Sequence, residues 1–253
     1  MTASPPQLRV ALVLGTASLF ATLALFPYVL ALQPHAFDKL PVAAAVVIAA
    51  QALQGGVIGF LLAWAGLKLG APLDLGAPWF AARLYPDRIK PAASGWWWAA
   101  GIGVAGALLL LGLIALFGEP LGATAAHATK LVSAPWQGAL ASFYGGIVEE
   151  IQLRLFMLTA IAWLLTRTRL RRSWALGIAV VAAALLFGAG HLPLAAKLTT
   201  LDLAIVLRIV GYNALLGLAF GWLYCKRGLE HAMLAHFSAD LVLHVVAPLA
   251  HSL

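Results

Sequence analysis

Seven apolar runs, each long enough to cross a membrane, constrain this chain more than any other feature of its sequence. At 1.5 Å per residue, about 20 residues of helix cross a hydrocarbon layer of ~30 Å. Only 10% of the 253 residues are charged, against roughly 25% in soluble globular proteins, so the chain has too little polar surface to face water. We therefore expect an all-α, polytopic integral membrane helix bundle. The runs are residues 10–32, 42–67, 96–117, 136–165, 174–193, 203–224 and 229–249.

No polar linker divides these runs, so we expect a single membrane domain over residues 1–253. The first run, residues 10–32, is longer than the ~7–15 apolar residues of a signal peptide, which favours an uncleaved first span. The fourth run, residues 136–165, is long and carries charges at its middle. It is either one tilted helix or two half-length pieces, and the charges of the loops favour one crossing.

The net charge of +7 comes from basic residues scattered between the apolar runs, which suits anionic lipid headgroups and not nucleic acid. With seven crossings, most loop lysines and arginines fall on one side of the membrane. The positive-inside rule then places the N-terminus in the cytoplasm and the C-terminus outside, in what we expect to be a bacterial plasma (inner) membrane. Nothing in the pattern indicates an oligomeric state. The basic side carries Arg9, Lys68, Arg83, Arg88, Lys90, Arg167, Arg169, Arg171, Arg172, Lys226 and Arg227, and the other side Lys39, Lys130 and Lys197.

Several ionisable residues remain inside the apolar runs. A charge at the bilayer centre costs ~2.5–3.5 kcal/mol on insertion scales, so such residues are kept for a partner or for a function. They are Glu149, Glu150, Arg154, His191, Arg208, His236, Asp240 and His244.

The spacing of the first three separates the two glutamates. Glu150 and Arg154 are four residues apart with the acid first, which favours an ion pair on one helix face. On an α-helix Glu149 points ~100° away from Glu150, so Arg154 can neutralise only one acid directly. Glu149 is then the free carboxylate, and a carboxylate in a low dielectric is a better base. The alternative is that both acids only hold helices together.

The histidines can reach the same depth. Measured from the basic turn at residues 167–172, Glu149 and His191 both lie ~25 Å along antiparallel helices. His236 and Asp240 are four residues apart, so the carboxylate can orient the imidazole, and His244 extends the same stripe. Each group also has a purely structural alternative: His191 as an interfacial histidine, and His236 with Asp240 as a helix-to-helix hydrogen bond.

Three motifs therefore follow one another on successive helices: EExxxR at residues 149–154, FxxxH at 187–191 and HxxxD at 236–240. In this order they resemble the CPBP family of intramembrane proteases. That family includes the endopeptidases that trim prenylated CAAX proteins, and bacterial relatives linked to bacteriocin processing or immunity. The resemblance covers residues 136–246 as a catalytic core, whereas residues 1–135 carry no recognised motif.

The resemblance implies an intramembrane endopeptidase of the glutamic type that needs no cofactor. Its substrate would be a membrane-associated or lipidated peptide or protein. Carried over by position, Glu149 and His191 would activate water. His236 and Asp240 would stabilise the oxyanion.

In the same comparison, Glu150 and Arg154 would brace the site. The chain departs from the eukaryotic branch at Asp240, where that branch has asparagine. A carboxylate has no N–H to donate, so Asp240 would have to be protonated or to act by orienting His236.

Two other readings fit the same residues. In one, Glu149, His191, His236 and Asp240 bind zinc in a metalloprotease, since these side chains are suitable zinc ligands. In the other, the protein is a transporter or an accessory membrane subunit whose buried charges relay protons or hold a partner. The chain contains no HExxH, GxSxG or CxxC motif, so the sequence does not support the common zinc, serine and thiol routes.

Overall fold

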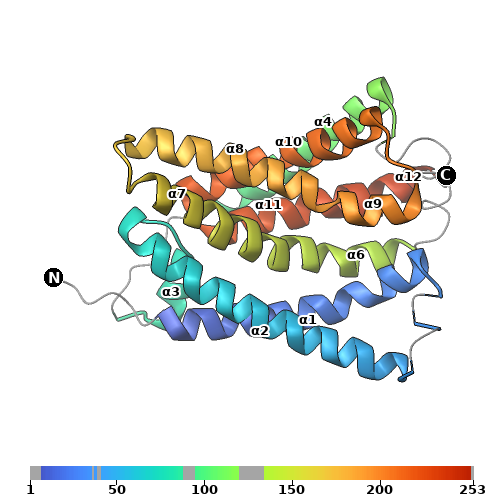
Figure 1. Cartoon of the computed structure of the whole chain (residues 1–253), viewed down its shortest axis with the longest axis horizontal. Helices are drawn as coiled ribbons and strands as arrows, with labels where there is room; N and C mark the ends of the chain where they lie inside the picture. The colour runs from blue at the N-terminus through green and yellow to red at the C-terminus, as the bar shows by residue number, and fades with distance from the viewer. Residues whose placement is uncertain (1–6, 36, 39–40, 88–94, 120–133, 252–253) are drawn as a thin grey trace.

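The computed structural model describes residues 7–35, 37–38, 41–87, 95–119 and 134–251, and every regular element in these ranges is a helix. The helices pack side by side into a bundle, in which α1 begins at one end and α12 finishes at the other (Figure 1). Six candidate membrane spans are present by length and composition. They are built on α1 (Gln7–Leu32), α2 (Ala44–Gly70), α4 (Trp96–Phe117), α8 (Arg172–Gly190), α10 (Leu203–Arg227) and α11 (Leu229–Leu241).

The fourth predicted run forms one unbroken helical path, which makes a seventh element. It begins as α6 (Pro135–Phe143) and ends as α7 (Thr159–Leu165). Between them lie two π-helical segments, Tyr144–Glu149 and Ile151–Leu158. Glu149 and Arg154 belong to these segments, and Glu150 lies between the two. The predicted polytopic helical bundle is confirmed, and the run forms the single helical path that the loop charges favour, although part of it is π-helical and not α-helical. π-Helical turns are rare and occur frequently at functional sites.

Shorter helices connect or extend the spans. The proline-rich loop after α2 holds a 3₁₀ turn (Ala71–Leu73) and α3 (Pro78–Leu84). The span that starts with α8 continues through α9 (Leu192–Leu198). After α11 the chain continues as a π-helical segment (Val242–Val246) and α12 (Ala247–His251). The loop residues Lys39, Arg88, Lys90 and Lys130, used in the topology prediction, lie outside the described residues.

The helical path from α6 to α7 lies at the centre of the bundle, between the α1–α2 pair and the helices α8, α10 and α11 (Figure 1). Glycines allow the helices to approach closely. A Cβ built at Gly66 would overlap the backbone of Leu155, and one at Gly188 would overlap the backbone of Val210. This close packing surrounds the charged middle of the central path with protein instead of lipid.

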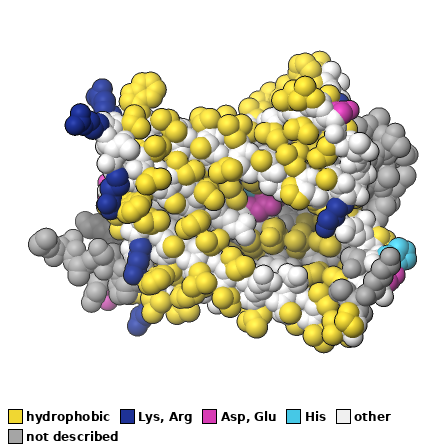
Figure 2. All heavy atoms as spheres, viewed as in Figure 1, with side chains coloured by type: hydrophobic (Ala, Val, Ile, Leu, Met, Phe, Trp, Pro, Cys, Tyr) yellow, Lys and Arg dark blue, Asp and Glu magenta, His cyan; other side chains and the backbone are white. Residues whose placement is uncertain are grey.

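The outer surface is apolar where lipid would touch it. Large hydrophobic side chains such as Trp97 and Leu116 are 68% and 77% exposed. Figure 2 shows most of the visible Lys and Arg side chains gathered at one end of the bundle, the end with the turn between α7 and α8. This distribution matches the charge asymmetry on which the predicted topology rests.

The predicted orientation can be tested directly. Reporter fusions placed after Arg172 and after Leu253 are expected to give opposite results, with the first in the cytoplasm. The physical reason is that α8, α10 and the α11–α12 segment provide three further crossings. Fusions that report the same side would show that one of these segments does not cross the membrane.

Candidate active site

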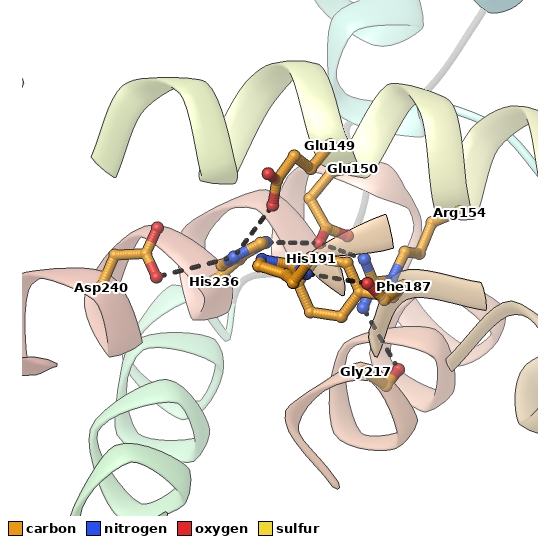
Figure 3. A network of polar contacts seen from close by, with 8 residues as sticks. All are labelled: Glu149, Glu150, Arg154, Phe187, His191, Gly217, His236 and Asp240. Carbon is orange, nitrogen blue, oxygen red and sulfur yellow. Dashed lines mark hydrogen bonds and ion pairs between the residues drawn. The ribbon is translucent and has the colours of Figure 1, made fainter. Parts of the chain in front are cut away.

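Residues from three parts of the chain meet inside the bundle (Figure 3). The central helical path provides two glutamates and an arginine. The junction of α8 and α9 provides one histidine, and α11 provides a second histidine and an aspartate. Their side chains point toward one another from different helices, as the depth argument from the sequence predicts. The six residues are Glu149, Glu150, Arg154, His191, His236 and Asp240.

The predicted ion pair between Glu150 and Arg154 is present. Arg154 Nη1 lies 2.9 Å from Glu150 Oε1, and the two side chains are 1% and 0% exposed. Removing water strengthens this attraction, but it also means that neither charge has a substitute partner in solvent. The pair is therefore a fixed element of the bundle interior.

Other groups also surround the Arg154 guanidinium. Its Nη2 donates to the main-chain oxygen of Gly217 on α10 at 3.3 Å. Its central carbon lies 4.7 Å from the ring centre of Phe187 and 5.4 Å from that of Phe220. Cation–π attraction of this kind is worth ~2 kcal/mol when the cation is desolvated. Arg154 thus ties the central path to α8 and α10.

His236 is held by Glu150 and by aromatic rings. Its Nδ1 lies 2.7 Å from Glu150 Oε1, which accepts the hydrogen bond. The imidazole stacks on Phe220 at 4.7 Å and meets the edge of Phe187 at 5.4 Å. Because the Nδ1 proton is donated to Glu150, any hydrogen bond from His236 to a substrate must come from Nε2.

This arrangement corrects the expectation that Asp240 orients the imidazole. Asp240 Oδ1 lies 3.6 Å from His236 Nε2, which is too long for a hydrogen bond, whereas Glu150 holds the opposite nitrogen. The reason is that an i, i+4 carboxylate on α11 reaches only the outer side of the ring. Glu150, on a separate helix, approaches the inner side directly.

Glu149 differs from Glu150 in its access to the outside. Its side chain is 23% exposed, and its Oε2 lies 3.8 Å from His236 Nε2. The gap to His236 exceeds hydrogen-bond length, so a water molecule or a substrate atom can lie between the two groups.

His191 is at the junction of α8 and α9, where it is half-buried. Its Nδ1 lies 2.8 Å from the main-chain oxygen of Phe187. A carbonyl oxygen only accepts, so Nδ1 carries the hydrogen and the neutral ring keeps a free lone pair on Nε2. No hydrogen bond or ion pair joins His191 to Glu149 among the described residues. Arg208 and His244, the other ionisable residues of the apolar runs, have different surroundings. Arg208 Nη1 donates a hydrogen bond to the main-chain oxygen of Glu119, which follows α4. His244 contacts the Tyr28 ring.

Several residues that pack around the candidate active site were not predicted from the sequence. Tyr28 on α1 meets the His244 ring edge-on at 5.9 Å. Phe220 packs on His236 without any motif that marks it. Gly145 had a visible signal in the sequence, because two consecutive glycines, Gly145 and Gly146, are unusual inside a helix and lie only a few residues before the glutamates.

Gly145 leaves the space that the α11 side chains occupy. A Cβ built there would overlap Asp240 Oδ2 and would lie 3.1 Å from His236 Nε2. Both side chains would then have to move. The glycine is therefore required by the close approach of the central helical path to α11.

The Gly145→Ala protein is expected to cleave its substrate roughly 10²-fold more slowly, because a displacement of ~1 Å in an active site can cost this much. The measurement is the cleavage rate in detergent. Gly177→Ala is the matched control, since a Cβ there meets nothing within 4 Å. Equal rates for the two variants would show that the observed positions of Asp240 and His236 do not matter for catalysis.

Among the residues that the structure describes, no group of three or more His, Cys, Asp and Glu side chains is placed to hold a metal ion. The Glu150 carboxylate is engaged with both Arg154 and His236 instead.

Comparison with known proteins identifies the part of the chain that contains this site. Residues 131–242 match the family model described as type II CAAX prenyl endopeptidase Rce1-like. The match covers less than half of the chain but includes all six residues of the cluster. No curated protein and no solved structure matches the chain. This family is one of endopeptidases, and the apolar helices place the protein in a membrane as a multi-pass protease. Residues 131–242 are thus similar to the Rce1-like type II CAAX prenyl endopeptidases.

Proposed function

We propose that the protein hydrolyses a peptide bond in a membrane-associated or lipidated peptide or protein through water activated by Glu149 and His191. The observation that carries this proposal is the contrast between the two neighbouring glutamates. Glu150 is fully buried and engaged with Arg154 and His236, whereas Glu149 is partly exposed in the same cluster. An accessible carboxylate beside histidines is the arrangement that general-base catalysis needs.

In the proposed reaction, water lies near Glu149 and the free Nε2 of His191. These groups take a proton as the water oxygen attacks the carbonyl carbon of the substrate. The carbonyl oxygen becomes an oxyanion near His236 Nε2, which can donate to it when that nitrogen is protonated. The C–N bond then breaks, and the proton passes to the leaving amine. Glu150 holds His236 throughout, and Arg154 balances the charge of Glu150.

Asp240 has an indirect part in this proposal. It lies 3.6 Å from His236 Nε2 and is 14% exposed, so it can assist the oxyanion when protonated or stabilise the charged imidazole. The partly exposed side of Glu149 is the proposed point at which the substrate reaches the site from the membrane. The cytoplasmic orientation of the basic end, and the bacterial plasma membrane as its location, belong to the same proposal.

The roles of Asp240 can be separated by two substitutions. Asp240→Asn keeps the size and one acceptor oxygen and adds N–H donors, so it is expected to retain substantial activity. Asp240→Ala is expected to lose ~10²–10³ in rate, the usual loss when one oxyanion donor is removed. Both variants are measured on one peptide in the same detergent, with a chelator control.

The opposite pattern would favour the zinc reading. Asparagine binds zinc poorly compared with a carboxylate. If Asp240→Asn is as inactive as Asp240→Ala, and added zinc restores chelated wild-type protein, a metalloprotease replaces the glutamic-type mechanism.

A further inference from the structure

The membrane span that contains His191 is interrupted at that residue. α8 ends at Gly190 and α9 begins at Leu192. The interruption lies ~24 Å along the helix from Trp174, inside a hydrocarbon layer of ~30 Å. Irregular backbone at this depth is tolerated only where it is buried in protein or lines a water-filled space, because lipid cannot satisfy its polar groups. The surroundings of this turn therefore decide what its main-chain groups can do.

The carbonyl oxygens of the last turn of α8 have lost their regular helical donors. The His191 N–H donates to the Gly188 oxygen at 3.2 Å, and His191 Nδ1 lies 2.8 Å from the Phe187 oxygen. Pro193 is at the position that would donate to the Ala189 oxygen in a continuous helix, and proline has no N–H. The His191 N–H also points toward the Ala189 oxygen, but it is shared with Gly188. A carbonyl oxygen accepts two hydrogen bonds, so the Ala189 oxygen can accept one from a ligand.

The same turn is open to the outside. Ala189, Gly190 and Pro193 are all exposed. A Cβ built at Gly190 meets no described atom within 4 Å, whereas one at Gly188 would overlap the backbone of Val210. Helix packing thus explains Gly188 but does not explain Gly190. The turn is therefore not buried in the bundle, and the space beside Gly190 is large enough for another chain to approach.

The open turn adjoins the proposed active site. His191 follows Gly190 directly, and its ring meets the edge of the Phe187 ring at 5.0 Å. Phe187 also meets the His236 ring edge-on at 5.4 Å, so one aromatic side chain contacts both imidazoles (Figure 3). A peptide that lies along the outer side of the turn is therefore next to a residue that the proposed mechanism uses.

We propose that the exposed turn at Ala189 and Gly190 binds the main chain of the substrate, with the Ala189 carbonyl oxygen accepting a hydrogen bond from a substrate N–H. The missing side chain of Gly190 allows the two backbones to approach. Main-chain hydrogen bonds of this kind hold a peptide in an extended conformation and supply affinity that does not depend on its side chains. The proposal rests on the proposed peptide hydrolysis and defines its substrate class as an extended polypeptide segment recognised through its backbone.

A binding measurement tests this recognition without requiring cleavage. The full-length Glu149→Gln protein in detergent is titrated with a fluorescent, palmitoylated peptide of alternating alanine and leucine. Binding is followed by fluorescence anisotropy against protein-free micelles. In a matched set of peptides, one amide at a time is replaced by an ester, which keeps the shape of the unit and removes its N–H. One of these esters is expected to weaken binding roughly fivefold or more.

Substitutions in the turn identify the protein atoms involved. Pro193→Ala supplies an N–H for the Ala189 oxygen, so in this variant the sensitive ester and the amide peptide are expected to bind equally. Gly190→Val fills the open space and is expected to weaken binding of every peptide roughly fivefold or more. Gly177→Val is the matched control, since Gly177 is also an open glycine on α8, and it is expected to bind as the parent does.

Three results would each overturn the proposal. They are equal binding of all the ester peptides and the amide peptide, unchanged binding by Gly190→Val, and an unchanged effect of the sensitive ester in Pro193→Ala. The proposed hydrolysis is tested separately. Wild-type protein that binds the peptide with the expected ester pattern but leaves it intact would contradict the proposed hydrolysis and would support the main-chain site.

Discussion

The Glu149→Gln protein is expected to lose peptide hydrolysis by at least ~10²-fold while it remains folded. Glutamine has nearly the same shape as glutamate but cannot take a proton from water at neutral pH. Glu149 forms no hydrogen bond among the described residues, and its ion-pair contact with His236 is long, at 3.8 Å. Its replacement therefore removes the proposed base without breaking a structural bond.

Two measurements on one preparation establish this result: the cleavage rate and the midpoint of thermal unfolding in detergent. Asp74→Asn, which neutralises an exposed acid outside the bundle interior, is the control for the loss of one negative charge. If Glu149→Gln cleaves the peptide at the wild-type rate, Glu149 is not the base. If it unfolds at a much lower temperature, Glu149 is a structural residue.

Glu150→Gln is expected to act mainly on stability. The substitution leaves the Arg154 charge uncompensated in a site where both side chains are at most 1% exposed. Breaking a buried ion pair from one side costs ~3–5 kcal/mol in folding free energy. For a chain of this length we expect the midpoint of thermal unfolding to fall by on the order of 10 °C.

The double variant Glu150→Gln/Arg154→Met separates the unpaired charge from the loss of packing. Methionine fills part of the space between Phe187 and Phe220 without a charge, so the double variant is expected to unfold at a higher temperature than Glu150→Gln alone. If Glu150→Gln kept full stability and lost all activity, the assignment of a structural role to Glu150 and a catalytic role to Glu149 would be wrong.

Much of the fold can be predicted from the sequence because the physical signal is strong and local. Apolar length alone locates the spans, so the predicted run 96–117 agrees with α4 at both ends. Equal depth on antiparallel helices predicts that the Glu149 and His191 regions meet. The i, i+4 rule predicts the pair formed by Glu150 and Arg154, which the structure contains.

The finer arrangement of the site depends on contacts between distant segments, which helix periodicity does not reveal. The hydrogen bond between His236 and Glu150 joins residues 86 apart in sequence, and it takes the place expected for Asp240. The π-helical turns at Tyr144–Glu149 and Ile151–Leu158 change the directions of side chains that an α-helix would assign. Phe220 has its position from packing on His236 of α11, and an apolar run of sequence contains no separate signal for such packing.

The most direct test of the account is cleavage of a membrane-associated peptide by the purified wild-type protein, with the products identified by mass spectrometry with and without a chelator. Hydrolysis by this site is expected to give two fragments whose masses add to that of the peptide plus one water molecule. The cleavage rate is expected to be the same with and without the chelator, because the proposed base and donors are side chains. Intact peptide under all conditions, or activity that disappears with the chelator and returns with zinc, would contradict the account.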